Sequence, residues 1–206
     1  FRENTYLVVK GGLVIGNLDT EPVTMGPISS RQKWKGVYVL GKGSDVKIQN
    51  MKVSDVLALT DGLLNLTGAL NFYETNLTIE KLDIENSLAE DALNVINSDF
   101  QITNVSIINT ISDAIDLDFS DGSLSKLDIS KIGGDAIDLS GSTVAMLDIN
   151  VTGVRDKALS IGESSKIEAS NINIAEAGVG IAVKDGSSAL IHDVNMSENY
   201  HYDYMT

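Results

Sequence analysis

A five-residue sequence, Asp-Ala-Ile-Asp-Leu, occurs at residues 113–117 and again at residues 135–139, an offset of 22 residues. Variants of it continue the same spacing at residues 91–95, 157–161 and 179–183. A fixed period in this range predicts a repeat architecture, in which each repeat stacks on its neighbours to bury a continuous core. The period therefore constrains the fold before any single residue is considered.

Within each repeat, apolar residues alternate with polar or small ones, and this period of two predicts strands rather than helices. The residues expected to point inward form columns at steps of 22 or 23. The first strand contributes Leu93, Ile115, Ile137, Leu159, Ile181 and Val95, Leu117, Leu139, Ile161, Val183. A second strand contributes Val105, Leu127, Ile149, Ile172 and Val194, and a weaker third strand lies between the two, around Phe100, Ile102 and Leu124.

Three short strands per 22-residue coil, separated by Gly, Ser, Asp and Asn, predict an all-β right-handed parallel β-helix. A left-handed β-helix would favour a hexapeptide rhythm, and 22 is not a multiple of six. We expect residues 1–33 to form an N-terminal cap or an irregular first coil, and residues 34–206 to form the β-helix. A loop near residues 57–64 is expected to project from it. Residues 200–206 begin a further coil, so we expect this end to stack on further coils or on another chain.

The charge is distributed unevenly along the chain. The net charge is −14, but residues 1–52 carry eight Lys or Arg against four Asp or Glu. An acidic body disfavours nucleic acid as a partner. The chain has no cysteine, which excludes disulfides and thiol catalysis, and no apolar run approaches the length of a membrane span.

Carboxylates recur on the outward side of the first strand. Asp116 and Asp118 are two residues apart on one strand, and Asp138 is expected one strand spacing from Asp116, on the next coil. Asp91, Asp113 and Asp135 are expected to stack at the turn just before this strand. Three interpretations remain open. The first is a calcium site formed by Asp116, Asp118 and Asp138. The second is a glycosidase pair, Asp116 and Asp138. The third is a solvated acidic ladder that prevents lateral aggregation.

Aromatic residues gather in the early coils, where Trp34, Tyr38 and Tyr73 are candidate binding residues for a polysaccharide or a surface protein. Packing beneath the N-terminal segment is the competing interpretation for Trp34.

The repeat pattern resembles the right-handed β-helix superfamily of pectate lyases and polygalacturonases. A closer resemblance, to β-helix regions of secreted bacterial surface proteins that accompany CotH-type kinase-like domains, is carried by residues 21–24, 34–39 and 156–163. This resemblance implies an extracellular or cell-surface location and no established chemistry.

Residues 112–116 and 134–138 look like the aspartate motifs of polygalacturonases, and Lys184 would match the substrate-binding lysine of that family. The chain departs from the family at two places. Residues 156–158, Asp-Lys-Ala, replace the family's Gly-His-Gly, and Ala182 replaces its arginine. These replacements remove a histidine that would assist catalysis and an arginine that would bind the carboxylate of the substrate. We therefore expect a non-catalytic extracellular module, a rigid spacer or adhesion segment. The alternative is a polysaccharide lyase or glycoside hydrolase that acts on an acidic glycan through Asp116, Asp138 and Lys184.

Overall fold

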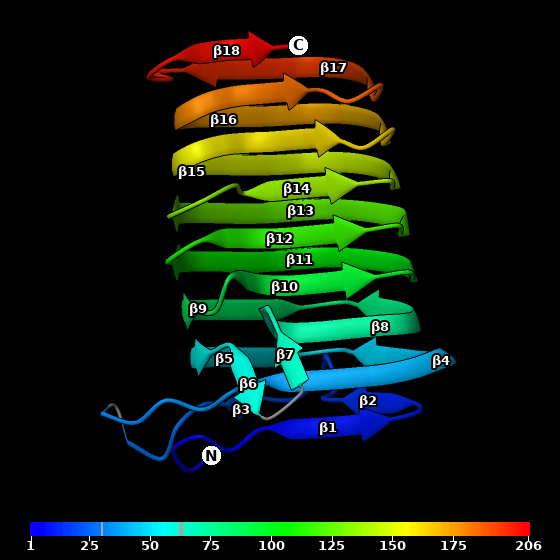
Figure 1. The fold of residues 1–206 in the computed structure, drawn as a ribbon, viewed down its shortest axis with the longest axis vertical. Coiled ribbons are helices and arrows are strands. Elements are labelled where there is room, and N and C mark those ends of the chain that lie inside the picture. Colours follow the sequence, from blue (N-terminus) through cyan, green and yellow to red (C-terminus); the bar gives the residue numbers. More distant parts are fainter. Residues whose placement is uncertain (30, 62–63) are drawn as a thin grey trace.

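The structure, a computed structural model, describes residues 1–29, 31–61 and 64–206. Its described residues form strands and turns without a helix, and the strands stack as the successive coils of one solenoid (Figure 1). The strands are β1 (Leu7–Lys10), β2 (Leu13–Ile15), β3 (Val23–Met25), β4 (Val37–Ile48), β5 (Met51–Leu57), β6 (Leu59–Asp61), β7 (Leu64–Leu66), β8 (Gly68–Ile79), β9 (Leu82–Leu88), β10 (Asp91–Ile96), β11 (Asp99–Thr110), β12 (Asp113–Asp118), β13 (Asp121–Ile132), β14 (Ile137–Ser140), β15 (Thr143–Gly162), β16 (Lys166–Val183), β17 (Ser188–Ser197) and β18 (Tyr202–Met205).

Each coil has three sides, which one repeat illustrates. β10 is the first side, and β11 supplies both the second and the third side. Single residues with left-handed backbone close the three bends, at Asn97, Asn104 and Asn109, where φ is 48°, 51° and 63°. Asparagine tolerates this conformation better than most residues, which explains why Asn recurs at the bends.

The coils pair in parallel, and the register follows the predicted columns. Leu93 pairs with Ile115, Ile115 with Ile137, and Ile137 with Leu159, each one coil of 22 residues further along. From β8 onward every such step is 22 or 23 residues, which confirms the predicted right-handed parallel β-helix.

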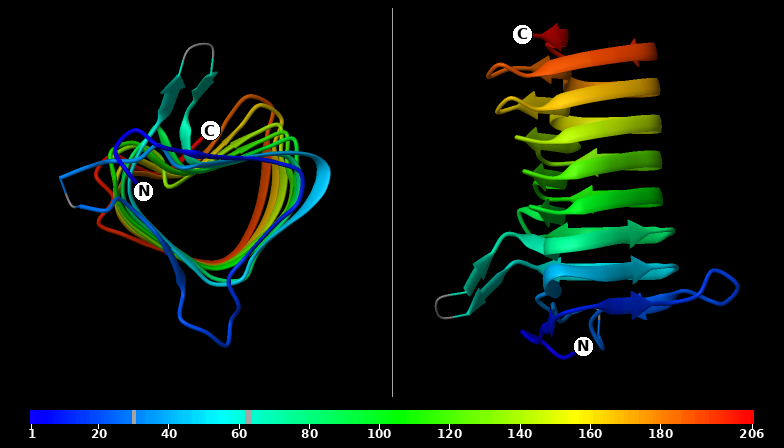
Figure 2. Two further views of the ribbon diagram at one scale, coloured as in Figure 1. Left: turned by 90° about the horizontal axis from the view of Figure 1, so that it is seen from below. Right: turned by 90° about the vertical axis from the view of Figure 1, so that its right-hand side faces the viewer.

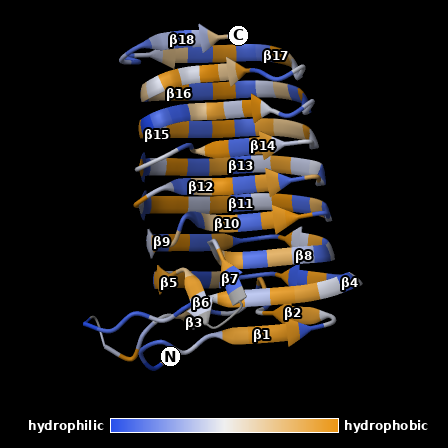
Figure 3. Ribbon diagram, in the orientation of Figure 1, coloured by the Kyte–Doolittle hydropathy of each residue, from blue (hydrophilic) through white to orange (hydrophobic). Residues whose placement is uncertain are grey.

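The predicted inward columns form the core. Leu93, Ile115, Ile137 and Leu159 are fully buried. Apolar and polar bands alternate along the strands of the regular coils in Figure 3. Full burial of such a side chain stabilises the fold by about 1.5–3 kcal/mol. Stacked over many coils, the columns make one continuous dry interior.

A second internal column, which the sequence analysis did not identify, consists of hydroxyl side chains just after the first bend. The Oγ atom of Ser98 accepts the backbone N–H of Thr75 at 2.9 Å, and the Oγ atom of Ser120 accepts that of Ser98 at 3.1 Å. Ser142 and Ser165 continue the pattern with bonds of 3.0 Å each. Each serine thus satisfies a backbone donor that the bend would otherwise leave buried without a partner.

The early coils are irregular. β1 and β2 run parallel to β4, and β3 runs parallel to β5, so residues 1–33 contain the strands of a first coil. β6 and β7 form the one antiparallel pair among the described strands. This hairpin projects from a corner of the three-sided section (Figure 2), where a loop was predicted. The part of that predicted loop at residues 62–63 lies outside the described residues. At the other end, β18 pairs with β16 at the predicted register.

Candidate functional site

The predicted acidic residues meet on the first side and at the bend that precedes it. We call Asp91, Asp113, Asp116, Asp118, Asp135 and Asp138 the acidic face. Asp116 pairs in register with Asp138 on the next coil, which places their strands about 4.8 Å apart. The two side chains were expected on the outward side of the strand, and both are partly exposed, whereas Asp91 and Asp135 are buried.

Two of these carboxylates join neighbouring coils. Asp113 Oδ1 accepts the backbone N–H of Asp135 at 2.7 Å, and Asp135 Oδ1 accepts that of Lys157 at 2.8 Å. Gly134 leaves the necessary room, because a Cβ atom there would collide with Asp113 Oδ1. Asp138 Oδ1 accepts the N–H of Leu139, at 3.0 Å. These contacts give the acidic face a structural role.

Polar side chains flank the two carboxylates of the first side. Asn94 precedes Asp116 by one coil and donates through Nδ2 to Asp91 Oδ2 at 3.0 Å and to Asp116 Oδ2 at 3.4 Å. Ser160 follows Asp138 by one coil. Both Asn94 and Ser160 are buried, and the Asn94 Oδ1 and Ser160 Oγ atoms have no hydrogen-bond partner among the described residues.

Burial and like charge favour the protonated carboxyl groups on this face. Burial raises the pKa of Asp116 to about 8, and the charges of Asp91, Asp118 and Asp138 add to the shift. Burial also raises the pKa of Asp113 to about 6, although its hydrogen bond from Asp135 opposes this change. Burial of a carboxyl group that has no cation in contact costs less free energy when the group is neutral than when it is charged.

The lysines that could serve as bases lie away from Asp116. Lys157 Nζ binds Asp156 Oδ2 at 2.8 Å and Asp135 Oδ1 at 3.3 Å. Burial opposes its charge, but these bonds raise its pKa overall, so this lysine stays protonated. Lys184 lies three coils beyond Asp118, a separation of about 14 Å along the axis.

Asp116, Asp118 and Asp138 were the expected calcium ligands. Within the described ranges, no three Asp, Glu or His side chains converge on a point where one ion could bind them all. Calcium takes six to eight oxygen ligands, and a calcium site at these three residues stays a prediction. The described part of the chain also contains no helix of the length and apolar character needed to span a membrane.

The structure corrects the candidate aromatic binding residues. Trp34 and Tyr38 are fully buried, so neither ring can stack on a ligand. The Trp34 Nε1–H donates to the Ser54 carbonyl at 2.8 Å, and the ring of Phe1 stacks on it at 4.2 Å. Packing, the competing interpretation, is therefore the role of Trp34. Tyr73 is the exception, because 42% of its surface is exposed.

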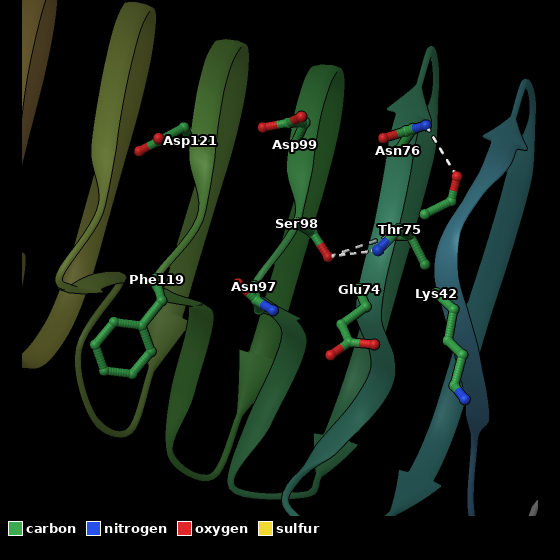
Figure 4. A pocket seen from close by; sticks show the side chains of 10 residues that line it. Lys42, Glu74, Thr75, Asn76, Asn97, Ser98, Asp99, Phe119 and Asp121 are labelled. Carbon is green, nitrogen blue, oxygen red and sulfur yellow. Dashed lines mark hydrogen bonds between the residues drawn. The ribbon is translucent and has the colours of Figure 1, made fainter.

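A groove that the sequence analysis missed runs along the first bends of four successive coils. It encloses about 620 Å³, and its residues come in two rows (Figure 4). One row consists of Lys42, Glu74, Asn97 and Phe119, and the other of Asn76, Asp99 and Asp121. Ser98 and Thr75 lie between the rows and are hydrogen-bonded to each other. We call this the first-bend groove. The sequence signal was a phenylalanine at a bend where neighbouring coils have asparagine or glycine.

Comparison with known proteins agrees with the observed coils. Residues 113–206 match a family model described as a right handed beta helix region. No curated protein matches the chain. The match covers less than half of the chain, and the structure shows the same right-handed parallel β-helix repeat in the matched coils and in the coils before them.

Proposed function

We propose that the protein is a non-catalytic module of an extracellular surface protein, and that it acts as a rigid spacer and binding segment. One observation carries the proposal. Asp113 and Asp135, which begin the two repeats that resemble aspartate motifs, use their carboxylates to hold the next coil. A carboxylate engaged with backbone N–H groups is a structural ligand, whereas a catalytic one must face the substrate.

The surroundings of the acidic face support the same conclusion. A lyase needs a deprotonated base, and Lys157 is held protonated by Asp156 and Asp135. Within the part of the chain that the structure describes, no carboxylate of the acidic face forms an ion pair with arginine or histidine. Among the described residues, the one cation paired with this face is Lys157, which Asp135 and Asp156 already neutralise, so an acidic polysaccharide would meet net repulsion there.

The continuous core supports the spacer role. The buried columns and the parallel ladders run through every regular coil, so bending the rod would open both together. Such a solenoid holds what lies at its two ends at a fixed separation.

A specific observation favours a second candidate, the glycoside hydrolase. Asp116 has its pKa raised to about 8, so it holds a proton at neutral pH, and Asp138 lies one strand spacing away. A retaining hydrolase uses such a pair. Asp116 would give its proton to the departing glycosidic oxygen, and Asp138 would attack the sugar carbon.

Incubation with pectin, polygalacturonate and alginate separates the two candidates. Reducing ends and the absorbance of unsaturated uronides are measured for the wild type, Asp138→Asn and Asp193→Asn. Asp193 is the matched control, because it is exposed and lies on another side of the coil. The module releases nothing. Product release that Asp138→Asn abolishes and Asp193→Asn retains would replace the module with the hydrolase.

Surface location is tested separately, by protease treatment of intact cells followed by immunodetection.

A further inference from the structure

We propose that the first-bend groove binds a neutral glycan chain, with Phe119 as the platform on which a sugar ring stacks. The inference rests on the proposed function, because it names the ligand class of a non-catalytic binding module. It concerns the bend that follows the first side, which adjoins Asp118 of the acidic face, whereas Asp91, Asp113 and Asp135 lie at the bend before that side.

Phe119 occupies a position that its own backbone disfavours. Its φ angle is 50°, a left-handed conformation in which a bulky residue is strained. The coil before it has Asn97 at this bend and the coil after it has Gly141, two residue types that adopt this conformation readily. The side chain of Phe119 is 62% exposed, so it adds little to the core. Neither backbone preference nor packing accounts for an aromatic residue here.

The next coil is shaped to accommodate the ring. A Cβ atom on Gly141 would lie 2.7 Å from Phe119 Cδ1, closer than such atoms approach each other. Glycine at position 141 therefore lets the phenyl ring lie across the neighbouring bend. The phenyl ring is therefore held against the neighbouring bend and faces the solvent, as stacking on the apolar face of a sugar requires.

The polar side chains around the ring are available to a ligand. Lys42, Glu74, Asn97 and Asp99 form no side-chain hydrogen bond or ion pair within the described residues. Figure 4 shows Lys42, Glu74 and Asn97 in the same row as Phe119, with Asp99 opposite. Amide, ammonium and carboxylate groups together supply both donors and acceptors. Sugar hydroxyl groups, which donate and accept, match such a mixture.

The charge of the groove selects among glycans. Its lining has three carboxylates, on Glu74, Asp99 and Asp121, against one ammonium group, on Lys42. A polyuronate would be repelled by this lining and by the net charge of −14. A neutral chain would not be repelled.

The dimensions of the groove fit a chain rather than a single sugar. Four coils span about 14 Å along the axis, at about 4.8 Å per coil. A second hollow of about 570 Å³ shares Lys42 and Glu74 with the groove and includes the half-exposed Tyr73. The two hollows thus contain two exposed aromatic side chains, Phe119 in the last of the four coils and Tyr73 two coils earlier.

The test is titration calorimetry of the full chain with neutral hexasaccharides built from glucose, mannose, xylose or N-acetylglucosamine. Hexagalacturonate and hexalysine are the charged comparisons. We expect at least one neutral hexasaccharide to bind more tightly than both charged probes. Phe119→Ala should weaken that binding about tenfold or more. The matched control is Ile111→Ala, because Ile111 is 59% exposed at a different bend and should leave the affinity unchanged.

A second variant separates ligand contact from folding. Phe119→Asn places at this bend the residue found one coil earlier, so it should melt no lower than the wild type and still lose binding. Failure of every neutral hexasaccharide to bind, preference for hexagalacturonate or hexalysine, or equal loss with Ile111→Ala would each overturn the inference. None of these results bears on turnover, so the module proposal stands or falls separately, by product release.

Discussion

Asp113 Oδ1 accepts the backbone N–H of Asp135 at 2.7 Å, and the two residues occupy the same position in successive coils. The bond joins two acidic residues that would otherwise repel each other, and it does so through the backbone of the second. The repeated Asp at this position therefore serves the stacking of coils.

The hydrogen bond, rather than the charge, is expected to matter for stability. Asp113→Ala leaves the N–H of Asp135 without its partner and should lower the free energy of unfolding by about 1–2 kcal/mol. Asp113→Asn keeps an acceptor oxygen and removes a like charge, so at pH 8 it should be at least as stable as the wild type. Urea denaturation of both variants measures this. Equal loss in both would mean that the negative charge is what stabilises the bend.

Stability should fall as the pH rises from 5 to 8.5. The pKa values of Asp113 and Asp116 are raised to about 6 and about 8, above the value of about 3.9 in an unfolded chain. Protonation therefore favours the folded state, and this contribution is lost as the pH rises through the folded pKa values. The melting temperature should decrease across this range, and above pH 6 the decrease should belong mainly to Asp116.

The variant Asp116→Asn tests whether the decrease in melting temperature above pH 6 is caused by Asp116. The amide stays neutral at every pH, so this variant should show a flatter melting profile between pH 6 and 8.5 and should melt higher than the wild type at pH 8.5. Asp193→Asn, at an exposed position, should reproduce the wild-type profile. A wild-type slope that survives in Asp116→Asn would assign the titration to another group.

The inward column can be tested with one chemical change at two positions. Ile137 is fully buried between Ile115 and Leu159, so Ile137→Asp places a charge in the core and should prevent folding. Leu147 is 49% exposed, and Leu147→Asp should change stability by about 0.5 kcal/mol or less. Circular dichroism melts of the two proteins give the comparison. Similar melts would mean that the inward and outward positions are exchanged.

Calcium should stabilise the protein no more than an equal ionic strength of sodium chloride. Both salts screen the repulsion among exposed carboxylates, whereas a specific site would add stability in proportion to its occupancy. Melting temperatures at millimolar calcium and in matched sodium chloride measure the difference. An additional calcium shift that disappears in the double variant Asp116→Asn/Asp138→Asn would establish a metal site on the acidic face.

The serine column should be sensitive to single deletions. Ser142 Oγ accepts the N–H of Ser120 and donates to the Leu117 carbonyl at 2.9 Å, within the buried interior. Ser142→Ala should cost about 1–3 kcal/mol, because it leaves buried groups unpaired. Ser130→Ala is the control, since Ser130 is only half-buried and forms no side-chain hydrogen bond among the described residues. Urea denaturation that ranks the two variants equally would contradict the structural role of the column.

The period and the alternation were sufficient to predict the fold, because identical positions in a solenoid must stack and a strand has only two faces. They could not predict how deep an outward residue lies. Asn94 and Ser160 occupy outward positions of the first strand, yet both are buried, because burial depends on the neighbouring coils and not only on the alternation within one strand. The burial of Trp34 could not be predicted for the same reason, since the stacking of Phe1 on its ring is a contact distant in sequence.

The first-bend groove was missed because it is made of bends. A search for periodic apolar positions passes over the residues between strands, and the unusual choice at Phe119 becomes visible only when its left-handed backbone is known. The serine column was not predicted for a related reason. Serine is common in turns, so its recurrence at a bend does not by itself indicate a buried hydrogen bond.

The β6–β7 hairpin shows where this architecture can accept new material. It enters and leaves at a corner, and the strands on either side, β5 and β8, keep their parallel pairing with the coils above and below. Added length at a corner therefore costs little, whereas a single extra residue within a side would exchange its inner and outer faces. Such a rod can diversify its corners while its sides stay constant, as a frame on which different loops are displayed at set heights.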